Sequence, residues 1–347
     1  MQNNNKNLRL PELDALRGIA AMMVVLFHYG LHRVSDESWL KFGVSGVELF
    51  FMISGFVIFM TLQKTASLQK FAINRFIRLY PTYWASLLFV SIMILSYAGL
   101  KGDIDLEDDF LQVFLANTTM LQHYFDLRDL EEPYWSLVVE LSFYLFIALL
   151  FYSPFKKYLN HVILIVIFLS LFPVFVNSLR PFFKAAMFYF PALPNLSLFF
   201  VGIQFFLIHE NKEHTARGLS LILFAMISQI VLFDYSGRSY VFLNQREFTA
   251  MIVLYHLIFL AFVLGRLSFI VHPITLFLGR ISYALYLSHF FVSHRHIIPY
   301  LVNTLNLPLW SAMIFFALPI NLLIATLLTY FVEIPSARIL KRLFHKG

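Results

Sequence analysis

Hydrophobic residues along this 347-residue chain gather in long runs, and short polar segments separate the runs. A helix needs about 20 apolar residues to cross a bilayer, and ten of the runs approach that length. We therefore predict an all-α, polytopic membrane protein with about ten transmembrane helices. The predicted spans lie near residues 14–33, 44–63, 82–99, 134–152, 160–178, 187–208, 218–234, 249–265, 276–297 and 309–332.

Two features bear on how these spans are organised. Pro191 and Pro194 interrupt the start of the sixth span, because proline lacks a backbone donor and bends or ends a helix. All loops are too short to hold a second domain, and the sequence shows no internal repeat. We therefore expect residues 1–347 to form a single integral membrane domain without an additional soluble domain, and any chemistry to take place inside the bundle or at its mouths.

The basic residues predict the orientation of the bundle. Ten spans place both termini on one side of the membrane, and lysine and arginine gather in cytoplasmic loops. Of the 26 basic residues, 17 lie on the side of the termini, whereas the longest loop opposite, residues 101–133, has nine acidic and two basic residues. We therefore expect both termini in the cytoplasm. The basic residues counted on that side are Lys6, Arg9, Arg17, Lys64, Lys70, Arg75, Arg78, Lys156, Lys157, Lys212, Arg217, Arg266, Arg280, Arg338, Lys341, Arg342 and Lys346.

Composition supports the membrane class and excludes several kinds of chemistry. The chain is 59% hydrophobic and 13% charged, whereas a soluble domain has about 25% charged residues. Cytoplasmic basic loops account for the net charge of +6, so no nucleic-acid partner is expected. Without cysteine, the chain has no disulfide, no thiolate metal site and no thioester intermediate of its own. No Walker loop, dinucleotide fingerprint or H-E-x-x-H spacing is present, and no metal site is expected.

The first span carries an ionisable residue at each end of the segment RGIAAMMVVLFH. Arg17 and His28 are eleven positions apart, which places them within ~20° on one helical face and ~16 Å apart along the axis. An intramembrane ionisable group is costly unless it is buried and partnered, so each one is a candidate for function. The alternative is an anchoring arginine with a core histidine that binds a backbone carbonyl.

Two carboxylates share a predicted depth with His28. Glu48 and Glu140 both lie early in spans that run inward, so both are expected in the outer half of the membrane. A carboxylate can orient an imidazole, select its tautomer and stabilise its protonated form. Either glutamate could therefore orient His28, which would act as a general base or be transiently acylated, although shared depth does not establish contact.

A second cluster of cations lies at the start of the third span, in FAINRFIRLYPTYW. The i, i+3 spacing of Arg75 and Arg78 puts both guanidinium groups on one face of a helical turn. Arginines beside Tyr80, Tyr83 and Trp84 fit phosphate binding with ring stacking. Ordinary cytoplasmic charge would explain the sign of these residues but leaves their clustering with aromatic rings unexplained.

Other candidates have weaker support. His289 lies deep in the ninth span, where a satisfied core histidine and a substrate contact are both plausible, and His256 has a weaker case. His294, Arg295 and His296 are expected in water near the outer mouth. Glu333 ends the last span and is expected to pair with a nearby arginine.

Six segments of the chain, in order, resemble the acyltransferase-3 family of integral membrane acyltransferases. They are LPELDALRGIAAMMVVLFHY with its Arg-x10-His pattern, GVELFFMISGFVIF, NRFIRLYPTYW, YWSLVVELSFYLF, ISYALYLSH and YFVEIP. The resemblance implies a ten-helix core that moves a small acyl group, often acetyl, from an acyl-coenzyme A to a hydroxyl of a carbohydrate or other cell-surface acceptor. It also implies a multi-pass protein of the bacterial inner membrane, with acyl-coenzyme A (acetyl-coenzyme A) as donor substrate and no permanently bound cofactor.

The resemblance also assigns roles to residues. Arg17 and His28 are implied as the paired functional residues, and Glu48 stands where many relatives have aspartate. The resemblance points to coenzyme A as the donor, and the basic residues predict its dock at Arg75 and Arg78, with Arg17 and Arg280 nearby. The glycan acceptor, free or lipid-linked, is expected on the other side of the membrane. The expected catalytic residues are His28, Arg17, Glu48 and Glu140, and the expected substrate contacts are Trp135, Tyr283 and His289. The alternatives are a proton-coupled transporter that uses intramembrane His and Glu, and a non-catalytic sensor of acyl donors.

Overall fold

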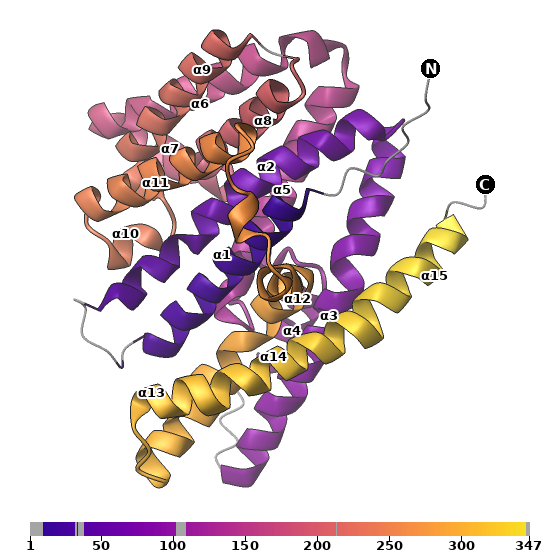
Figure 1. The fold of residues 1–347 in the computed structure, drawn as a ribbon, viewed down its shortest axis with the longest axis vertical. Coiled ribbons are helices and arrows are strands. Elements are labelled where there is room, and N and C mark those ends of the chain that lie inside the picture. Colours follow the sequence, from indigo (N-terminus) through magenta and orange to yellow (C-terminus); the bar gives the residue numbers. More distant parts are fainter. Residues whose placement is uncertain (1–9, 32, 34–37, 102–108, 213, 345–347) are drawn as a thin grey trace.

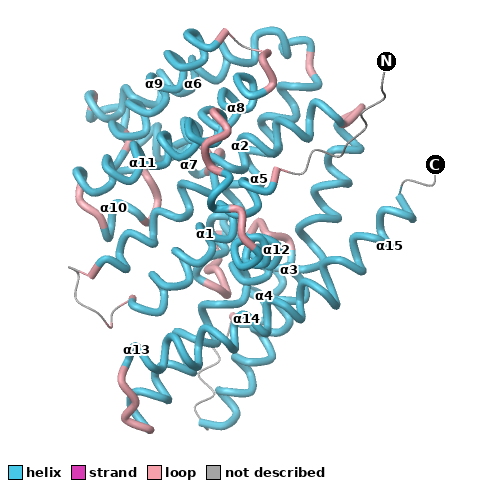
Figure 2. The backbone as a smooth tube through the Cα atoms, viewed as in Figure 1, coloured by secondary structure: helices cyan, strands magenta, loops and turns pink. Residues whose placement is uncertain are grey.

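The computed structural model describes residues 10–31, 33, 38–101, 109–212 and 214–344. Within these ranges the chain consists of helices, turns and loops and contains no β-strand (Figure 2). The all-α prediction is confirmed. Lys6, Arg9 and Lys346, which contributed to the orientation argument, lie outside the described residues.

Seven helices in the described ranges are long and apolar enough to cross a membrane, and each overlaps a predicted span. The third begins at Leu68, 14 residues before the predicted start, and the last continues to Phe344, 12 residues beyond the predicted end. The last of them, residues 309–344, is the long yellow rod in Figure 1 and combines α13, α14 and α15. The helix bounds are α1 (Pro11–Gly30), α2 (Gly46–Lys64), α3 (Leu68–Lys101), α5 (Trp135–Tyr152), α6 (Leu159–Phe175), α11 (Gln245–Val263), α13 (Leu309–Ser311), α14 (Leu318–Leu327) and α15 (Ile334–Phe344).

The other three predicted spans have helices that differ from a simple crossing. The sixth is a pair, α7 (Arg180–Tyr189) and α8 (Leu196–His209), bent by 95° where the two prolines interrupt the helix. The seventh is α9 (Thr215–Val231), a shorter apolar helix. The ninth is α12 (Pro273–His289), which continues as a π-helix, η9 (Phe290–Ile297).

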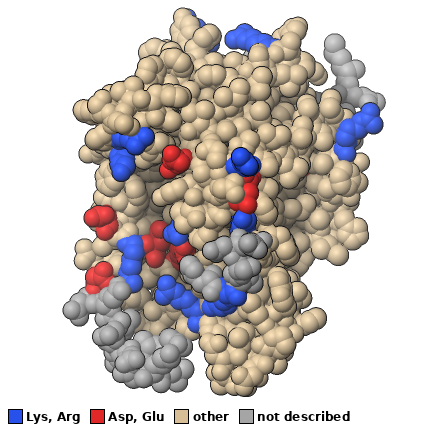
Figure 3. Space-filling view, turned by 90° about the vertical axis from the view of Figure 1, so that its left-hand side faces the viewer, with Lys and Arg blue, Asp and Glu red and all other residues tan. Residues whose placement is uncertain are grey.

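The outside of the bundle is apolar. The face shown in Figure 3 is mostly tan, with charged side chains in a few clusters. Ile165, Phe168 and Leu169 on α6 are each more than half exposed. A contiguous apolar exterior of this kind is suited to lipid. Two short helices, α4 (Phe110–Thr118) and α10 (Ser239–Phe242), lie in the connections between the long ones.

Two glycines set the contact between α1 and α12, which lie against each other at the centre of Figure 1. A Cβ atom on Gly279 would lie 2.0 Å from the carbonyl oxygen of Asp14, and one on Gly18 would lie 2.6 Å from the Gly279 nitrogen. Only glycine permits this approach of two backbones. Gly18 and Gly279 are 261 residues apart, and so are His28 and His289, which also touch. The two helices are therefore parallel and in constant register from the glycines to the histidines.

A second glycine pair joins α2 to α8. A Cβ atom on Gly55 would lie 2.0 Å from the carbonyl oxygen of Phe199, and one on Gly202 would lie 2.1 Å from that of Met52. This close packing supports α2, which runs between the α1–α12 pair and the rest of the bundle (Figure 1). The position of α2 matters because one of its faces lines the main cavity.

Candidate active site

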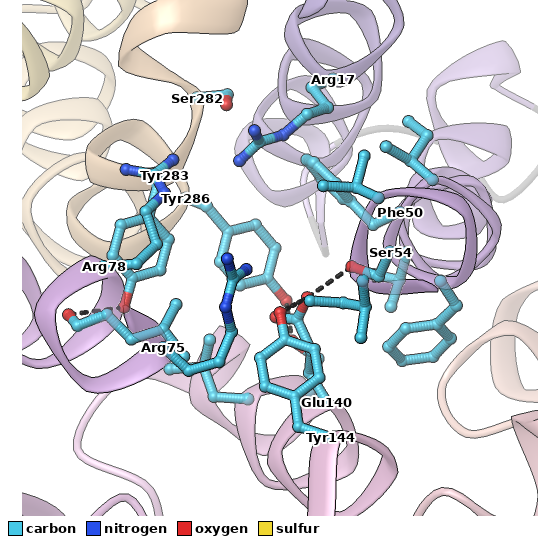
Figure 4. Close-up of a pocket in the computed structure, with 18 residues that line it drawn as sticks. Arg17, Phe50, Ser54, Arg75, Arg78, Glu140, Tyr144, Ser282, Tyr283 and Tyr286 are labelled. Carbon is cyan, nitrogen blue, oxygen red and sulfur yellow. Dashed lines mark hydrogen bonds between the residues drawn. The ribbon is translucent and has the colours of Figure 1, made fainter. Parts of the chain in front are cut away.

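A cavity of about 220 Å³ lies between α1, α2, α3, α5 and α12. Figure 4 shows Arg17 entering it from α1 and Arg75 and Arg78 from α3. Apolar side chains of α2 form one wall, and the tyrosines of α12 form another. The described residues that line it are Arg17, Val47, Phe50, Phe51, Ile53, Ser54, Val57, Ile58, Arg75, Arg78, Leu79, Ser136, Leu137, Glu140, Tyr144, Ser282, Tyr283 and Tyr286.

The cavity has an excess of positive charge. Arg78 forms an ion pair with Glu333, which confirms the expectation that Glu333 pairs with an arginine. Neither Arg17 nor Arg75 forms an ion pair within the part of the chain that the structure describes, and the Arg75 Nε is buried without a hydrogen-bond partner. Because an unsatisfied buried donor is costly, this arrangement favours an anionic ligand that the two guanidinium groups can bind.

Glu140 is the one carboxylate in this lining, and its neighbours hold it in place. Ser54 donates a hydrogen bond to its carboxylate, and the Tyr144 hydroxyl donates another at 2.5 Å (Figure 4). Glu140 therefore shares the cavity with Arg17 and Arg75. The cavity lining does not include His28.

His28 and His289 form a separate, buried pair. His289 Nε2 lies 3.0 Å from His28 Nδ1, and the two side chains are 0% and 8% exposed, respectively. His289 Nδ1 lies 3.1 Å from the carbonyl oxygen of Leu285 and 3.0 Å from that of Tyr286. His28 Nδ1 also lies 2.9 Å from the carbonyl oxygen of Val24.

These partners assign the tautomers of both rings. A carbonyl oxygen only accepts, so Nδ1 of His289 carries its proton and Nε2 of that neutral ring has a lone pair. The lone pair accepts from Nδ1–H of His28, which is shared with Val24. The unprotonated nitrogen of His28 is then Nε2, which has no hydrogen-bond partner within the described residues. His28 thus presents a free basic nitrogen in a fixed orientation, as a general base requires.

Asn321 on α14 holds the outer end of the histidine pair. Its amide nitrogen donates to the His289 carbonyl at 3.1 Å and to the Ser293 hydroxyl at 2.6 Å. The same nitrogen lies against the hydroxyl of Tyr29, the neighbour of His28, so its two hydrogens are shared among three acceptors. One amide therefore joins α1, α12 and the start of η9 directly beside the two imidazoles.

Glu131, in the loop before α5, holds the start of η9, the segment that directly follows His289. Its carboxylate oxygens accept from the backbone N–H of Phe291, at 3.1 and 3.0 Å, where the α-helix changes to a π-helix. The side chain is 1% exposed, and burial raises its pKa to about 8. Glu131 is therefore largely neutral near pH 7 and still accepts hydrogen bonds.

The structure does not bring Glu48 or Glu140 to His28. Glu48 is buried and its side chain lies against Ser239 of α10, and its Oε2 has no hydrogen-bond partner within the described residues. Glu140 faces the cavity instead. The polar partners of the His28 side chain are the Val24 carbonyl and His289. His289 thus holds the place beside His28 that the sequence led us to expect for a carboxylate.

The remaining candidates are placed as follows. The Tyr283 hydroxyl donates to the Leu79 carbonyl at 3.0 Å, and the Arg78 guanidinium lies 5.5 Å from the ring centre of Tyr283. Arg280 donates to the Tyr330 hydroxyl at 2.9 Å and does not line the cavity.

Trp135 and His294 lie toward the end of the bundle that is opposite Arg17. Trp135 packs beside Gly237, which has a positive φ of 69°. His294 was expected in water, but it is half-buried and lies 2.8 Å from the His28 carbonyl oxygen through its Nδ1. The side chain keeps part of its exposure and lines a surface pocket together with Arg33, while η9 turns it back toward α1.

Comparison with known proteins places these observations in a family. The family model described as an acyltransferase domain matches residues 10–330. The chain is 25% identical to ORF330 of Acidianus two-tailed virus, provisionally named an acetyltransferase, over 80% of this chain and 82% of that protein. It is 33% identical to the peptidoglycan O-acetyltransferase OatA of Listeria monocytogenes, but that match covers 39% of this chain and 23% of OatA. No solved structure matches the chain.

An all-helical bundle with apolar spans, a basic cavity and a buried imidazole pair defines a membrane protein with a polar interior site. The chain belongs to the acyltransferase-3 family, as the match over nearly its whole length shows. It is therefore a membrane acyltransferase, and the transporter and sensor alternatives are set aside.

Proposed function

We propose that this protein transfers a small acyl group, acetyl in the first instance, from an acyl-coenzyme A to a hydroxyl of a carbohydrate or other cell-surface acceptor. The observation that carries the proposal is the cavity in which Arg17 and Arg75 have no ion-pair partner among the described residues. Coenzyme A is polyanionic, and guanidinium groups bind phosphate through charge-assisted hydrogen bonds. The names of the relatives, acetyltransferase and O-acetyltransferase, agree with this chemistry.

The size of the cavity indicates which part of the donor it would hold. Sites for drug-sized ligands usually measure about 300–1,000 Å³, and this cavity measures about 220 Å³. That volume suits the thioester and its flexible arm better than the whole donor. The nucleotide would then lie at the basic end, where Arg17, Arg75 and Arg78 meet.

The histidine pair would perform the transfer. The acceptor hydroxyl gives its proton to His28 Nε2 as its oxygen attacks the thioester carbonyl carbon. The tetrahedral intermediate then expels the coenzyme A thiolate, which takes the proton from His28, and the acyl group remains on the acceptor oxygen. Throughout this cycle Nδ1–H of His28 keeps its bonds to Val24 and His289, so the ring does not need to reorient.

The cavity and the histidine pair are separated by aromatic side chains. Tyr286 lines the cavity, and its ring centre lies 6.0 Å from that of His289 and 5.8 Å from that of Phe50. The Tyr286 hydroxyl is 2.6 Å from the Ser136 hydroxyl and donates to the Pro133 carbonyl at 3.0 Å. The thioester reaches His28 only when this wall opens, so donor entry requires Tyr286 to move.

The positive-inside pattern places the donor cavity toward the cytoplasm. Arg17 lies near the start of α1, and His28 lies near its end. A donor from the cytoplasm would then be bound at one end of α1, and an acceptor on the other side would be acylated at the other end. This geometry suits a protein of the bacterial inner membrane that modifies surface glycans.

The direct test uses the full chain in lipid vesicles with isotope-labelled acetyl-coenzyme A and a panel of glycan acceptors. Peptidoglycan fragments come first, because OatA is named for peptidoglycan O-acetylation. We expect labelled acetyl esters on one acceptor class and release of free coenzyme A in equal amount. If labelled acetyl phosphate is used equally well, or no acceptor takes the label, the proposal is wrong.

A further inference from the structure

A second, larger cavity of about 440 Å³ opens at the same end of the bundle as Arg17, on the other flank of α2. The end of α2 and the end of α5 meet there, because the Tyr152 hydroxyl donates to the Thr65 carbonyl at 2.9 Å. No residue is shared with the lining of the arginine cavity. The described residues that line it are Phe59, Gln63, Phe151, Lys156, Lys157, Leu159, Asn160, His161, Leu207, Lys212 and Arg217.

Four cations face this cavity, and its described lining contains no Asp or Glu. Lys156 and Lys157 come from the turn before α6, Lys212 from the connection between α8 and α9, and Arg217 from the first turn of α9. Lys212 forms an ion pair with Glu210 at 3.7 Å, and the Glu210 side chain is 38% exposed. An exposed pair of this kind contributes little and leaves the cationic character of the cavity intact.

The amide side chains in the lining present donors as well. Gln204 is fully buried, and its Nε2 donates to Asn160 Oδ1 at 3.0 Å. Lys212 donates to Gln63 Oε1. Because both amide oxygens are already engaged, the NH2 groups of Asn160 and Gln63 remain as donors. Ammonium, guanidinium and amide N–H groups together require a ligand that accepts hydrogen bonds and carries negative charge, as a phosphate ester does.

The other half of the lining is apolar. The apolar walls are formed by Phe59, Phe151, Leu159 and Leu207. Lys156 Nζ lies over the ring of Phe151, 3.8 Å from its centre. The cavity borders the lipid-facing surface, because Tyr158 and Phe155 beside it are 48% and 61% exposed and α6 continues with exposed apolar side chains. Aromatic residues at this level mark the interface between membrane and water.

We propose that this cavity binds the phosphate group of an anionic membrane lipid, with the acyl chains of that lipid against the apolar walls and α6. Basic pockets between transmembrane helices on the cytoplasmic side suit such head groups. A soluble phosphate shares the oxyanion chemistry but would leave the apolar half of the cavity unused. The lipid would hold the ends of α2, α5, α6 and α8 together, on the flank of α2 that faces away from the arginine cavity.

Native mass spectrometry of the full chain, with phosphatidylglycerol titrated into a phosphatidylcholine background, measures this binding without any assay of activity. The test variant combines Lys156→Gln, Lys157→Gln and Lys212→Gln. The control combines Arg266→Gln, Lys341→Gln and Arg342→Gln, which removes three exposed cations that are also predicted on the cytoplasmic side. At about a fivefold loss per lysine near a membrane surface, three substitutions multiply to roughly 100-fold. We therefore expect the test variant to bind phosphatidylglycerol roughly 100-fold more weakly and the control to bind it normally.

Three results would overturn the proposal. Equal retention of lipid by wild type and test variant would show that the cavity does not bind it. Equal weakening in the control would show a general charge effect rather than a site. A third arm adds inorganic phosphate and adenosine 3′,5′-bisphosphate without lipid: lysine-dependent binding of either, as tight as that of phosphatidylglycerol, would make the cavity a site for soluble phosphate.

Discussion

The arginine cavity and the histidine pair are built in opposite ways. The cavity is hollow and has two guanidinium groups without ion-pair partners among the described residues. The histidine pair is tightly packed, and three of its four ring nitrogens are engaged in hydrogen bonds. A region prepared for a ligand keeps unsatisfied charge and space, whereas a region prepared for proton transfer fixes its rings in advance. The comparison suggests that donor binding and catalysis are divided between the two.

The largest effect is expected from His28→Ala. Removing the free Nε2 eliminates the proposed general base, which contributes about 10²- to 10⁴-fold in typical enzymes, so kcat should fall by roughly 10³-fold. Steady-state transfer of labelled acetyl by the purified variant measures this. His256→Ala is the matched control, because His256 is also a buried histidine that bonds a carbonyl of its own helix, 2.7 Å from Ile252. An active His28→Ala variant would remove His28 from the chemistry.

Arg75→Gln should affect the other region. Loss of a charge-assisted hydrogen bond costs about 1.5–3 kcal/mol, so KM for acetyl-coenzyme A should rise roughly 10- to 100-fold with kcat nearly unchanged. Initial rates across donor concentrations measure both constants. Arg266→Gln removes an exposed arginine and should leave both unchanged. A fall in kcat at constant KM would contradict the binding role of Arg75.

His289 acts through His28, and two variants separate its positioning role from a packing role. His289→Leu fills space but removes the acceptor for Nδ1–H of His28, so kcat should fall roughly tenfold and the pH dependence of kcat should shift. His289→Gln can offer an amide oxygen to the same hydrogen and should recover most of the activity. Equal losses in the two variants, with an unchanged pH profile, would assign His289 to packing alone.

The smallest effect is expected at Glu131, which bonds the backbone of Phe291 close to the histidine pair. Burial raises the pKa of Glu131 to about 8 from an ordinary 4.5, so its stabilising contribution is complete below pH 4.5 and is lost as pH rises through 8. Within that window the wild type should lose about 1.4 kcal/mol of unfolding free energy per pH unit from this group. Thermal unfolding in detergent from pH 5 to 9 should show this slope in the wild type and a flatter one in Glu131→Gln. Parallel curves would contradict the assignment.

Local patterns predicted the cavity better than they predicted the histidine pair. Arg75 and Arg78 are three positions apart, so one helical turn brings them together and the sequence shows it directly. The contact between His28 and His289 depends on the register of α1 against α12, which Gly18 and Gly279 set at long range. No periodicity within either helix contains that information.

The misplaced carboxylates have a related cause. Equal depth in the membrane does not determine which way a side chain points around its helix. Glu48 lies against Ser239 and Glu140 against Ser54, and neither bonds His28. Two residues that hold the histidine pair in place, Asn321 and Glu131, are not among the predicted site residues. Asn321 was visible as a polar residue in an apolar span, whereas Glu131 was counted within an acidic loop and gave no separate signal.

The division of labour between the two regions is the central claim, and calorimetric binding of a non-reactive acetyl-coenzyme A analogue tests it most directly. Wild type, His28→Ala and Arg75→Gln are compared as purified full-length proteins. Neither His28 nor His289 lines the cavity, and the residue that links the two regions is Tyr286, which lines the cavity and whose carbonyl oxygen lies 3.0 Å from His289 Nδ1. The account therefore predicts that His28→Ala binds the analogue within about twofold of wild type, while Arg75→Gln binds it at least about tenfold more weakly. Loss of affinity in His28→Ala equal to that in Arg75→Gln, or unchanged affinity in Arg75→Gln, would contradict the account.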